Sequence, residues 1–204
     1  MIGIIHYGSG NVRAIGNIYD KLKIDYRIIE SVGELCDVKK IILSGVGAFD
    51  ETMNNLNKSG FREVLEHLVL IDKIPVLGIC VGMQILSSGS DEGVLPGLGW
   101  IPGKVKKIDK SKLITKPKLP HLGWNSIEIQ KANLILNGVD VNEGFYFIHS
   151  YYFECEFEVD ILTKTHYGVD FASAVNRENI FGTQFHPEKS HSNGICLLEN
   201  FALM

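Results

Sequence analysis

The first half of the chain alternates between short, continuous apolar runs and segments with helical spacing. The apolar runs, which are typical of buried strands, lie at 2–6, 39–45 and 76–79, and a strand-like run that also carries charged residues lies at 24–30. The segments with apolar residues at helical spacing lie at 11–22, 61–71 and 81–88. This alternation predicts an α/β fold, with an open, mostly parallel sheet flanked by helices on both faces.

The second half of the chain has a different pattern. Four strand-like runs follow one another with short joins, at 145–154, 160–168, 171–177 and 179–187. They predict an antiparallel extension of the sheet, and an apparent helix at 193–203 ends the chain. Neither an internal repeat nor a long linker divides the sequence, so we predict one domain over 1–204.

Composition narrows the class of protein. The chain has 204 residues, of which 45% are hydrophobic and 22% charged, and this length suits one globular domain with a sizeable core. The net charge of −4 argues against a general nucleic-acid binder. No apolar run approaches the roughly 18–20 residues that span a bilayer. The N-terminus lacks a basic leader, so we expect no signal peptide and no membrane partner.

Cysteine usage indicates a reducing compartment. The four cysteines, none in a C-x-x-C pair, are Cys36, Cys80, Cys155 and Cys196. This spacing argues against a disulfide scaffold and against a zinc site. We therefore expect free thiols in a cytoplasmic protein.

One segment has a biased composition. Residues 104–118 contain seven lysines and one acidic residue. Such a segment is either a solvated hairpin or loop, or a face that meets an acidic partner or an anionic ligand.

A cysteine lies between two glycines in the stretch GICVG, 78–82, where a predicted strand meets a predicted helix. Glycines on both sides of Cys80 allow a sharp turn around a strained nucleophile backbone. Such a turn presents the thiol at the carboxyl edge of the sheet, where open α/β folds place their sites. Backbone amides of the next helix favour a thiolate and can stabilise an oxyanion. Cys80 is therefore either a nucleophile or a buried structural thiol.

A thiolate that performs acyl transfer needs a base, usually histidine, and a group that orients the base. Of the seven histidines, His186 in FGTQFHPEKS is the best candidate. It ends an apparent strand that Pro187 terminates. Glu188 follows two residues later, so it can face the same side and hold the imidazole. These residues form a Cys-His-Glu triad if they lie near Cys80; otherwise H-P-E is a polar strand end.

The elbow GICVGMQ, the segment FGTQFHPEKS and the loop SGVGAF together resemble class I, triad-type glutamine amidotransferases. More narrowly, the chain is similar to the glutaminase subunits of imidazole glycerol phosphate synthases, which act in histidine biosynthesis. Met83 and Lys189 favour this branch, since other members more often carry G-H-Q after the cysteine and H-P-E-S at the triad. The further motifs of the resemblance are YGSGN, 7–11; GLGWIPGKV, 97–105; PHLGWNSI, 120–127; and FYFIHSYY, 145–152.

The resemblance implies a flavodoxin-like fold and a two-subunit reaction. Glutamine is hydrolysed to glutamate and ammonia, and the ammonia passes to a (β/α)8-barrel cyclase subunit with which the chain forms a heterodimer. The cyclase then forms imidazole glycerol phosphate and an aminoimidazole carboxamide ribotide. The glutaminase step is expected to need no cofactor and no metal.

The resemblance also assigns roles residue by residue. Cys80 attacks the glutamine amide, His186 acts as base and then as acid, and Glu188 fixes and charges the imidazole. The oxyanion donors are the backbone amides of Val46 and Val81. The substrate-binding positions are Gly47, Gln84, Glu92 and the backbone of Ser150 and Tyr151. The partner-facing or gating positions are Asn11, Trp124, Asn125, Tyr146 and Lys189.

Two positions depart from the family pattern, and they keep alternatives open. His6 replaces an acidic residue in the first loop, and Ser44 replaces a proline before the Gly45–Val46 peptide. Altered loops are also expected in a paralogous glutaminase that supplies ammonia for amidino groups on a bacterial surface sugar. A cysteine peptidase or γ-glutamyl hydrolase is a further alternative, because it can use the same triad. A non-catalytic binding module, by contrast, would not react through Cys80.

Overall fold

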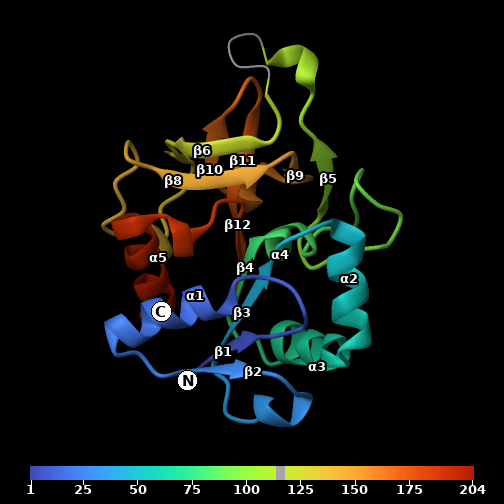
Figure 1. Cartoon of the computed structure of the whole chain (residues 1–204), viewed down its shortest axis with the longest axis vertical. Helices are drawn as coiled ribbons and strands as arrows, with labels where there is room; N and C mark the ends of the chain where they lie inside the picture. The colour runs from blue at the N-terminus through green and yellow to red at the C-terminus, as the bar shows by residue number, and fades with distance from the viewer. Residues whose placement is uncertain (114–117) are drawn as a thin grey trace.

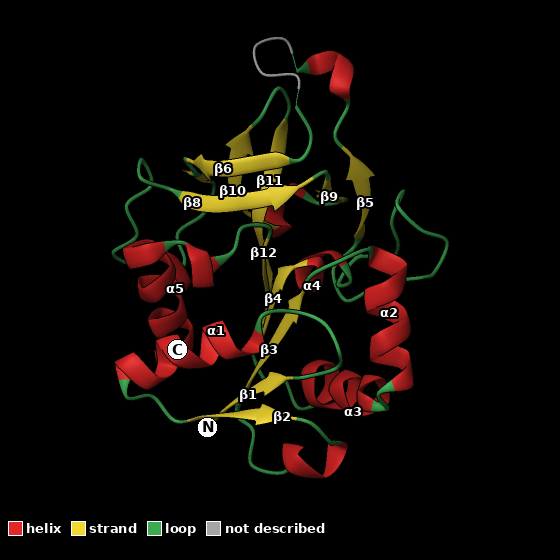
Figure 2. Ribbon diagram, in the orientation of Figure 1, coloured by secondary structure: helices red, strands yellow, loops and turns green. Residues whose placement is uncertain are grey.

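The computed structural model of the chain describes residues 1–113 and 118–204. Within these residues, ten strands form one large sheet and two form a small second sheet (Figures 1 and 2). Part of the lysine-rich segment, 114–117, lies outside the described residues. No helix among the described residues is long and apolar enough to cross a membrane.

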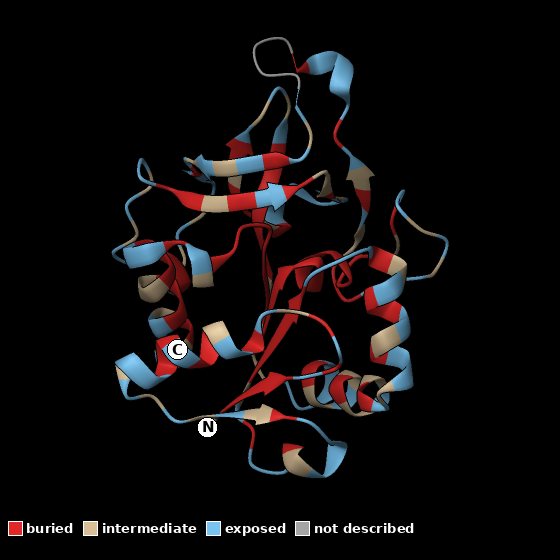
Figure 3. Ribbon diagram, viewed as in Figure 1, coloured by how far each residue is buried: buried red, intermediate tan, exposed pale blue. Residues whose placement is uncertain are grey.

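The parallel half of the large sheet is built from the apolar runs. Its strands are β1 (Ile2–Ile5), β2 (Tyr26–Ile29), β3 (Lys40–Gly45), β4 (Val76–Cys80) and β12 (Ile180–Thr183). They pair in the order β2-β1-β3-β4-β12, every pair parallel. The central strands β3 and β4 are almost wholly buried, as Figure 3 shows. Their burial on both faces explains the continuous apolar runs.

Helices cover both sides of this sheet, as predicted. They are α1 (Val12–Leu22), α2 (Phe49–Lys58), α3 (Phe61–Glu66), α4 (Val81–Gln84) and α5 (His191–Leu203). α1 and α5 lie on one side, and α2 and α3 on the other (Figure 2). The predicted mostly parallel, helix-flanked sheet is therefore confirmed.

The antiparallel extension is also confirmed. β11 (Asp170–Arg177) pairs antiparallel with β12 and with β10 (Ile161–His166), and β10 pairs with β7 (Glu128–Ile129). β9 (Tyr151–Cys155) pairs antiparallel with both β11 and β5 (Gly103–Lys107). The start of the lysine-rich segment is thus a strand, in which Lys104 Nζ lies 2.9 Å from Asp91 Oδ1.

The prediction of a single strand over 145–154 is wrong. β8 (Phe145–His149) pairs with β6 (His121–Asn125) in the small sheet, whereas β9 belongs to the large sheet. Ser150 separates them. The alternation of buried residues continues through both strands, at Phe145, Phe147 and Phe153. The local pattern therefore contains no sign of the change of partner.

Two helix predictions also need correction. The helix after Cys80 ends at Gln84 rather than at 88, because the Leu86 and Ser87 N–H groups bond three residues back, to Met83 and Gln84. This tighter bonding ends the helix. The segment 61–71 is α3 followed by a π-helical turn, His67–Ile71.

α2 was not predicted, and its N-terminus explains why. Its N-cap residue is Ala48, which has no side chain that can cap the helix. The first N–H, that of Phe49, instead donates to Glu92 Oε2 at 2.9 Å. A cap supplied from 43 positions away leaves no local helix-start signal.

Candidate active site

Cys80 lies at a sharp turn between β4 and α4. Its φ is 57° and its ψ is −114°, a backbone conformation that is strained for a residue with a side chain. A Cβ on Gly82 would collide with the Leu43 carbonyl, and a Cβ on Gly78 would collide with the Gly82 carbonyl. Both glycines are therefore needed for the helix to pack this closely on the sheet, and the predicted elbow geometry is confirmed.

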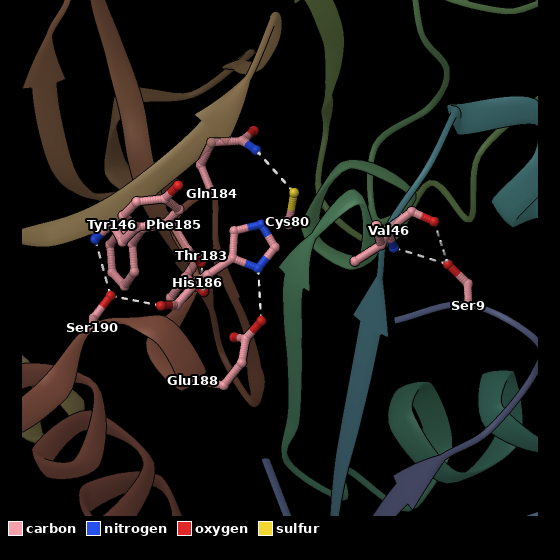
Figure 4. Close-up of polar contacts among 10 residues, drawn as sticks. All are labelled: Ser9, Val46, Cys80, Tyr146, Thr183, Gln184, Phe185, His186, Glu188 and Ser190. Atoms are coloured by element: carbon pink, nitrogen blue, oxygen red, sulfur yellow. Dashed lines mark hydrogen bonds and ion pairs between the residues drawn. The ribbon is translucent and has the colours of Figure 1, made fainter. Parts of the chain in front are cut away.

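His186 and Glu188 form a buried pair. His186 Nδ1 lies 2.8 Å from Glu188 Oε1, and the two side chains are 3% and 0% exposed. Glu188 does not lie on a strand, since β12 ends at Thr183; it lies in the 3-10 turn Pro187–Lys189. The Ser190 hydroxyl donates to the His186 carbonyl at 2.6 Å and accepts the Tyr146 N–H at 3.0 Å (Figure 4). These bonds hold the turn in place.

The other edge of the His186 ring faces Cys80 (Figure 4). Burial lowers the pKa of His186, but its interactions with Cys80 and Glu188 act in the opposite direction and raise the pKa from 6.5 to about 10. The imidazole is therefore held as a cation next to the sulfur. Cys80, His186 and Glu188 thus lie in the order that a nucleophile, its base and an orienting acid require.

The predicted oxyanion donor Val46 is engaged by a serine. Its N–H donates to Ser9 Oγ at 2.9 Å, and the same hydroxyl donates to the Val46 carbonyl at 3.0 Å. Val81, the other predicted donor, directly follows Cys80 at the start of α4. Ser9 was not among the predicted site residues. Its only sequence signal is its place in the YGSGN loop, 37 positions away from Val46.

A pocket of about 360 Å³ opens over Cys80. The predicted residues that line it are Val46, Gly47, Cys80, Val81, Gln84, Glu92, Ser150, Tyr151, His186 and Lys189. Glu188 lies behind His186 rather than in the pocket wall. Asn11 lies apart, beside a second hollow at the start of α1.

Two buried glutamines connect the pocket to the nucleophile. Gln84 Nε2 donates to the Tyr151 carbonyl at 3.1 Å and to Gln184 Oε1 at 2.9 Å. Gln184 Nε2 in turn lies 3.8 Å from Cys80 Sγ (Figure 4). Gln184 was missed in the sequence. Its available signal was its position two residues before His186, which places both side chains on one side of an extended segment.

Glu92, predicted to receive a substrate ammonium, already has one partner. Its Oε2 accepts the Phe49 N–H of α2 at 2.9 Å. The carboxylate lines the pocket beside Gly47, so its other oxygen is the one available to a ligand.

Two buried histidines lie at the pocket: His149 lines it, and His121 contacts His149. His149 Nδ1 lies 2.8 Å from the Tyr151 carbonyl, and His149 Nε2 lies 2.9 Å from His121 Nδ1. Because a carbonyl only accepts, His149 Nδ1 carries a proton, and His121 donates to His149. Burial lowers the pKa of His121 to about 4, and burial together with the charge of His121 lowers that of His149 to about 3. Both rings are therefore neutral at pH 7.

The small sheet carries most of the predicted partner-facing residues. Trp124 lies opposite Tyr146 in the β6–β8 register. Trp124 is 42% exposed and makes an edge contact with the His191 ring at 5.1 Å. Lys189 Nζ lies 5.7 Å from the centre of the Tyr146 ring. Asn125 donates to the His166 carbonyl at 3.0 Å. Trp124, Tyr146 and Lys189 therefore share a surface next to the pocket mouth, whereas the Asn125 side chain lies on the opposite face of β6, 3.2 Å from His121 Nε2.

In the parts of the chain that the structure describes, no group of three or more His, Cys, Asp or Glu side chains is placed to hold a metal ion.

The whole chain is similar to known proteins of one family. The family model described as glutamine amidotransferase class-I matches residues 8–204. Proteins named imidazole glycerol phosphate synthase subunit HisH are similar over 202 residues, and the matches cover 99% of both chains. Identity is 50% for Leptospira borgpetersenii, 51% for Leptospira interrogans and 48% for Bdellovibrio bacteriovorus.

Solved structures share the fold at low sequence identity. PurLQS from Thermotoga maritima has a TM-score of 0.74 and 15% identity, covering 99% of this chain and 96% of that one. A glutamine amidotransferase from the same organism has a TM-score of 0.62 and 16% identity, covering 92% and 75%.

Proposed function

Because this chain belongs to the class-I glutamine amidotransferase family, we propose that it hydrolyses glutamine to glutamate and ammonia as the glutaminase subunit of an imidazole glycerol phosphate synthase. The observation that carries this proposal is the position of Cys80. It lies on a strained elbow and faces a buried His186–Glu188 pair at the floor of a pocket. The relatives at 48–51% identity support the histidine-biosynthesis role.

The geometry supports a two-step mechanism. The Cys80 thiolate attacks the side-chain carboxamide carbon of glutamine, and the C–N bond breaks as His186 gives its proton to the departing ammonia. Water, activated by the same imidazole, then hydrolyses the γ-glutamyl thioester and releases glutamate and the thiolate. Glu188 holds His186 in orientation and stabilises its positive charge. The backbone amides of Val46 and Val81 stabilise the oxyanion.

The pocket walls account for the recognition of glutamine. Glu92 receives the substrate ammonium through its free oxygen, and the Ser150–Tyr151 backbone binds the α-carboxylate. Gly47 and Gln84 line the remaining wall. The reaction needs no metal or cofactor, because the triad supplies the nucleophile, base and acid.

Ammonia leaves toward a cyclase subunit that docks on the small sheet. Three exposed apolar side chains of β6 and β8 support this surface: Leu122, Trp124 and Ile148. Tyr146 and Lys189 border it, Asn125 supports it from the opposite face of β6, and Asn11 lies on a second part of the interface. The four free thiols support a reducing, cytoplasmic location.

The alternatives are less well supported. The relatives at 48–51% identity carry the synthase name, so the comparisons do not favour the sugar-modifying paralogue. A peptidase or γ-glutamyl hydrolase would not account for the exposed apolar surface beside the pocket mouth.

The test is reconstitution with the histidine-pathway cyclase subunit of the same organism. Wild type should hydrolyse glutamine, and its rate should rise strongly when the cyclase holds its nucleotide ligand. Cys80→Ala should lose glutamine-dependent synthesis but keep synthesis from ammonium salts. Cys36→Ala, which removes an exposed thiol, should behave as wild type. Loss of ammonium-dependent synthesis in Cys80→Ala would contradict this division of labour, and absence of nucleotide stimulation would favour the paralogue.

A further inference from the structure

A buried glutamine that has no role in the proposed mechanism lies against the nucleophile. Gln184 follows β12 and is fully buried, and its side-chain Nε2 donates to Cys80 Sγ at 3.8 Å (Figure 4). Its backbone N–H donates to the Ser173 carbonyl at 2.8 Å, so the main chain is held as well. Burying an amide costs free energy unless its polar atoms are bonded. The partners of Gln184 therefore define what the residue does.

The orientation of the Gln184 amide follows from its neighbours. The Tyr151 carbonyl can only accept, so the Gln84 atom 3.1 Å away is the amide nitrogen. The same nitrogen lies 2.9 Å from Gln184, which must therefore present its oxygen there. A reversed Gln184 amide would bring two nitrogens together and place an oxygen against Cys80. An N–H donor thus faces the sulfur.

A donor in this place favours a negatively charged sulfur. Hydrogen bonds to ions are stronger than those between neutral groups, and burial strengthens them further. The titratable groups around Cys80 are His186, with Glu188 behind it, and Tyr7, together with Glu92, His149, Tyr151 and Lys189 of the same pocket. Burial raises the pKa of Tyr7, and the charge of Cys80 raises it further, so Tyr7 stays neutral. The partners of a thiolate are therefore the charged imidazolium of His186 and the neutral N–H donor of Gln184.

We propose that Gln184 is a further catalytic residue of the glutamine hydrolysis proposed above, because its amide N–H holds and stabilises the Cys80 thiolate. Gln84 and Tyr151 keep that amide in its orientation. The thiolate attacks in the first step and leaves when the thioester is hydrolysed, so the contact acts on both steps. The residues that line the pocket include Gln84 but not Gln184. Gln184 therefore acts on rate and not on glutamine binding.

The test uses Gln184→Met, which removes the N–H and keeps the length of the side chain. The probe is iodoacetamide, which needs no glutamine site, and alkylation of Cys80 is followed by peptide mass spectrometry across pH. We expect alkylation at pH 7 to slow about tenfold and its pH midpoint to rise, the effect of losing a hydrogen bond to a charged group. Glutaminase kcat in the complex should fall by about the same factor, with KM changed less than about twofold.

Thr183→Val is the matched control. Thr183 directly precedes Gln184, and its hydroxyl donates to the Phe185 carbonyl at 3.2 Å and not to Cys80. The substitution removes only that hydroxyl. Its alkylation rate should equal that of wild type. If Gln184→Met does not fold, as judged by circular dichroism, Gln184→Asn is measured instead, because its amide is one methylene too short to reach the sulfur. The same slowing is expected.

Two results would overturn the proposal. Equal alkylation of Cys80 in wild type and the folded variant would make Gln184 a structural residue. A higher KM at unchanged kcat would mean that Gln184 acts on substrate binding through Gln84. A wild-type chain that neither hydrolyses glutamine in the complex nor alkylates faster at Cys80 than at exposed Cys36 would instead contradict the proposed function. The two failures are therefore distinguishable.

Discussion

The Val46 N–H donates to Ser9 Oγ at 2.9 Å, and the same hydroxyl donates to the Val46 carbonyl at 3.0 Å. Ser9 therefore holds the Gly45–Val46 peptide, which carries a proposed oxyanion donor, through its N–H, and the following Val46–Gly47 peptide through its carbonyl. The Val46 residue is 56% exposed, so little packing opposes its rotation. While this contact is made, the Val46 N–H is not available to the oxyanion. Such a contact can keep the glutaminase rate low until the partner binds its ligand.

Ser9→Ala should raise the basal glutaminase rate of the isolated subunit. The two lost bonds stabilise the engaged conformation of Val46 by about 1 kcal/mol each, so we expect an increase of up to about 30-fold. Steady-state release of glutamate without the cyclase measures it. The control Ser31→Ala removes an exposed hydroxyl that bonds Glu34 and should leave the rate unchanged. An unchanged or lower basal rate in Ser9→Ala would show that this contact does not restrain the site.

Glu188→Gln should impair the triad through the charge of His186. Burial lowers the pKa of His186, and Cys80 and Glu188 together raise it to about 10. Without the carboxylate, the pKa falls and the imidazolium is lost near neutral pH. We expect kcat to fall roughly 100-fold or more. The pH profile of kcat and NMR titration of the His186 ring measure the change.

The same substitution has a stability signature of defined sign. A raised histidine pKa stabilises the fold below the unfolded pKa of 6.5, and that stabilisation is lost as pH rises toward about 10. In Glu188→Gln, the free energy of unfolding in urea should therefore fall less steeply between pH 7 and 10 than it does in wild type. Glu178→Gln removes an exposed carboxylate that pairs with Lys73 at 2.8 Å and should change neither activity nor slope. A full decline retained in Glu188→Gln would assign the effect to other groups.

His149→Asn should reduce the acid sensitivity of the fold. The folded-state pKa of His149 is lowered to about 3, mainly by burial, so the unfolded chain takes up a proton first as pH falls below 6.5. Stability contributed by the neutral ring is present above pH 6.5 and is lost as pH falls toward about 3. The variant should lose up to about 1.4 kcal/mol per pH unit less than wild type in that window.

Urea unfolding at pH 7, 6, 5 and 4 measures this difference in slope. The Asn amide can still donate to the Tyr151 carbonyl, so the variant keeps one native contact. His67→Asn, at an exposed position, should leave the slope as in wild type. Parallel slopes for His149→Asn and wild type would show that His149 does not govern acid unfolding.

Trp124→Ala should weaken binding of the cyclase more than it weakens folding. The indole is 42% exposed and contacts His191 at the edge of the small sheet. Loss of an aromatic anchor from an interface costs about 2 kcal/mol or more of binding, a rise in Kd of roughly 30-fold. Calorimetric titration with the cyclase and thermal melting of the free subunit separate the two effects.

Phe157→Ala is the matched control for that measurement. Phe157 is 46% exposed but lies in the segment before β10, away from the small sheet. Its loss should leave the affinity for the cyclase unchanged. A large drop in Tm for Trp124→Ala, with unaltered affinity, would make Trp124 a core residue instead.

The local pattern of the sequence was sufficient to predict the parallel sheet and the turn that carries Cys80. Continuous apolar runs predicted β1, β3 and β4, because strands buried on both faces admit few polar residues. The spacing G-x-C-x-G predicted the elbow, since only glycine fits at Gly78 and Gly82. The two-residue spacing of His186 and Glu188 predicted a contact that the structure realises through a turn rather than a strand.

The tertiary structure decided what depends on residues far apart in the chain. Ser150 marks a change of sheet that no alternation of buried residues reveals, because both strands face the same core. Glu92 caps α2 from 43 positions away, and Gln184 reaches Cys80 across 104. Residues close together in the sequence determine whether a segment forms a helix or a strand and which of its faces is buried. Which polar atoms satisfy one another inside the protein is determined only when the chain has packed, because buried groups must bond to whatever the fold brings within reach.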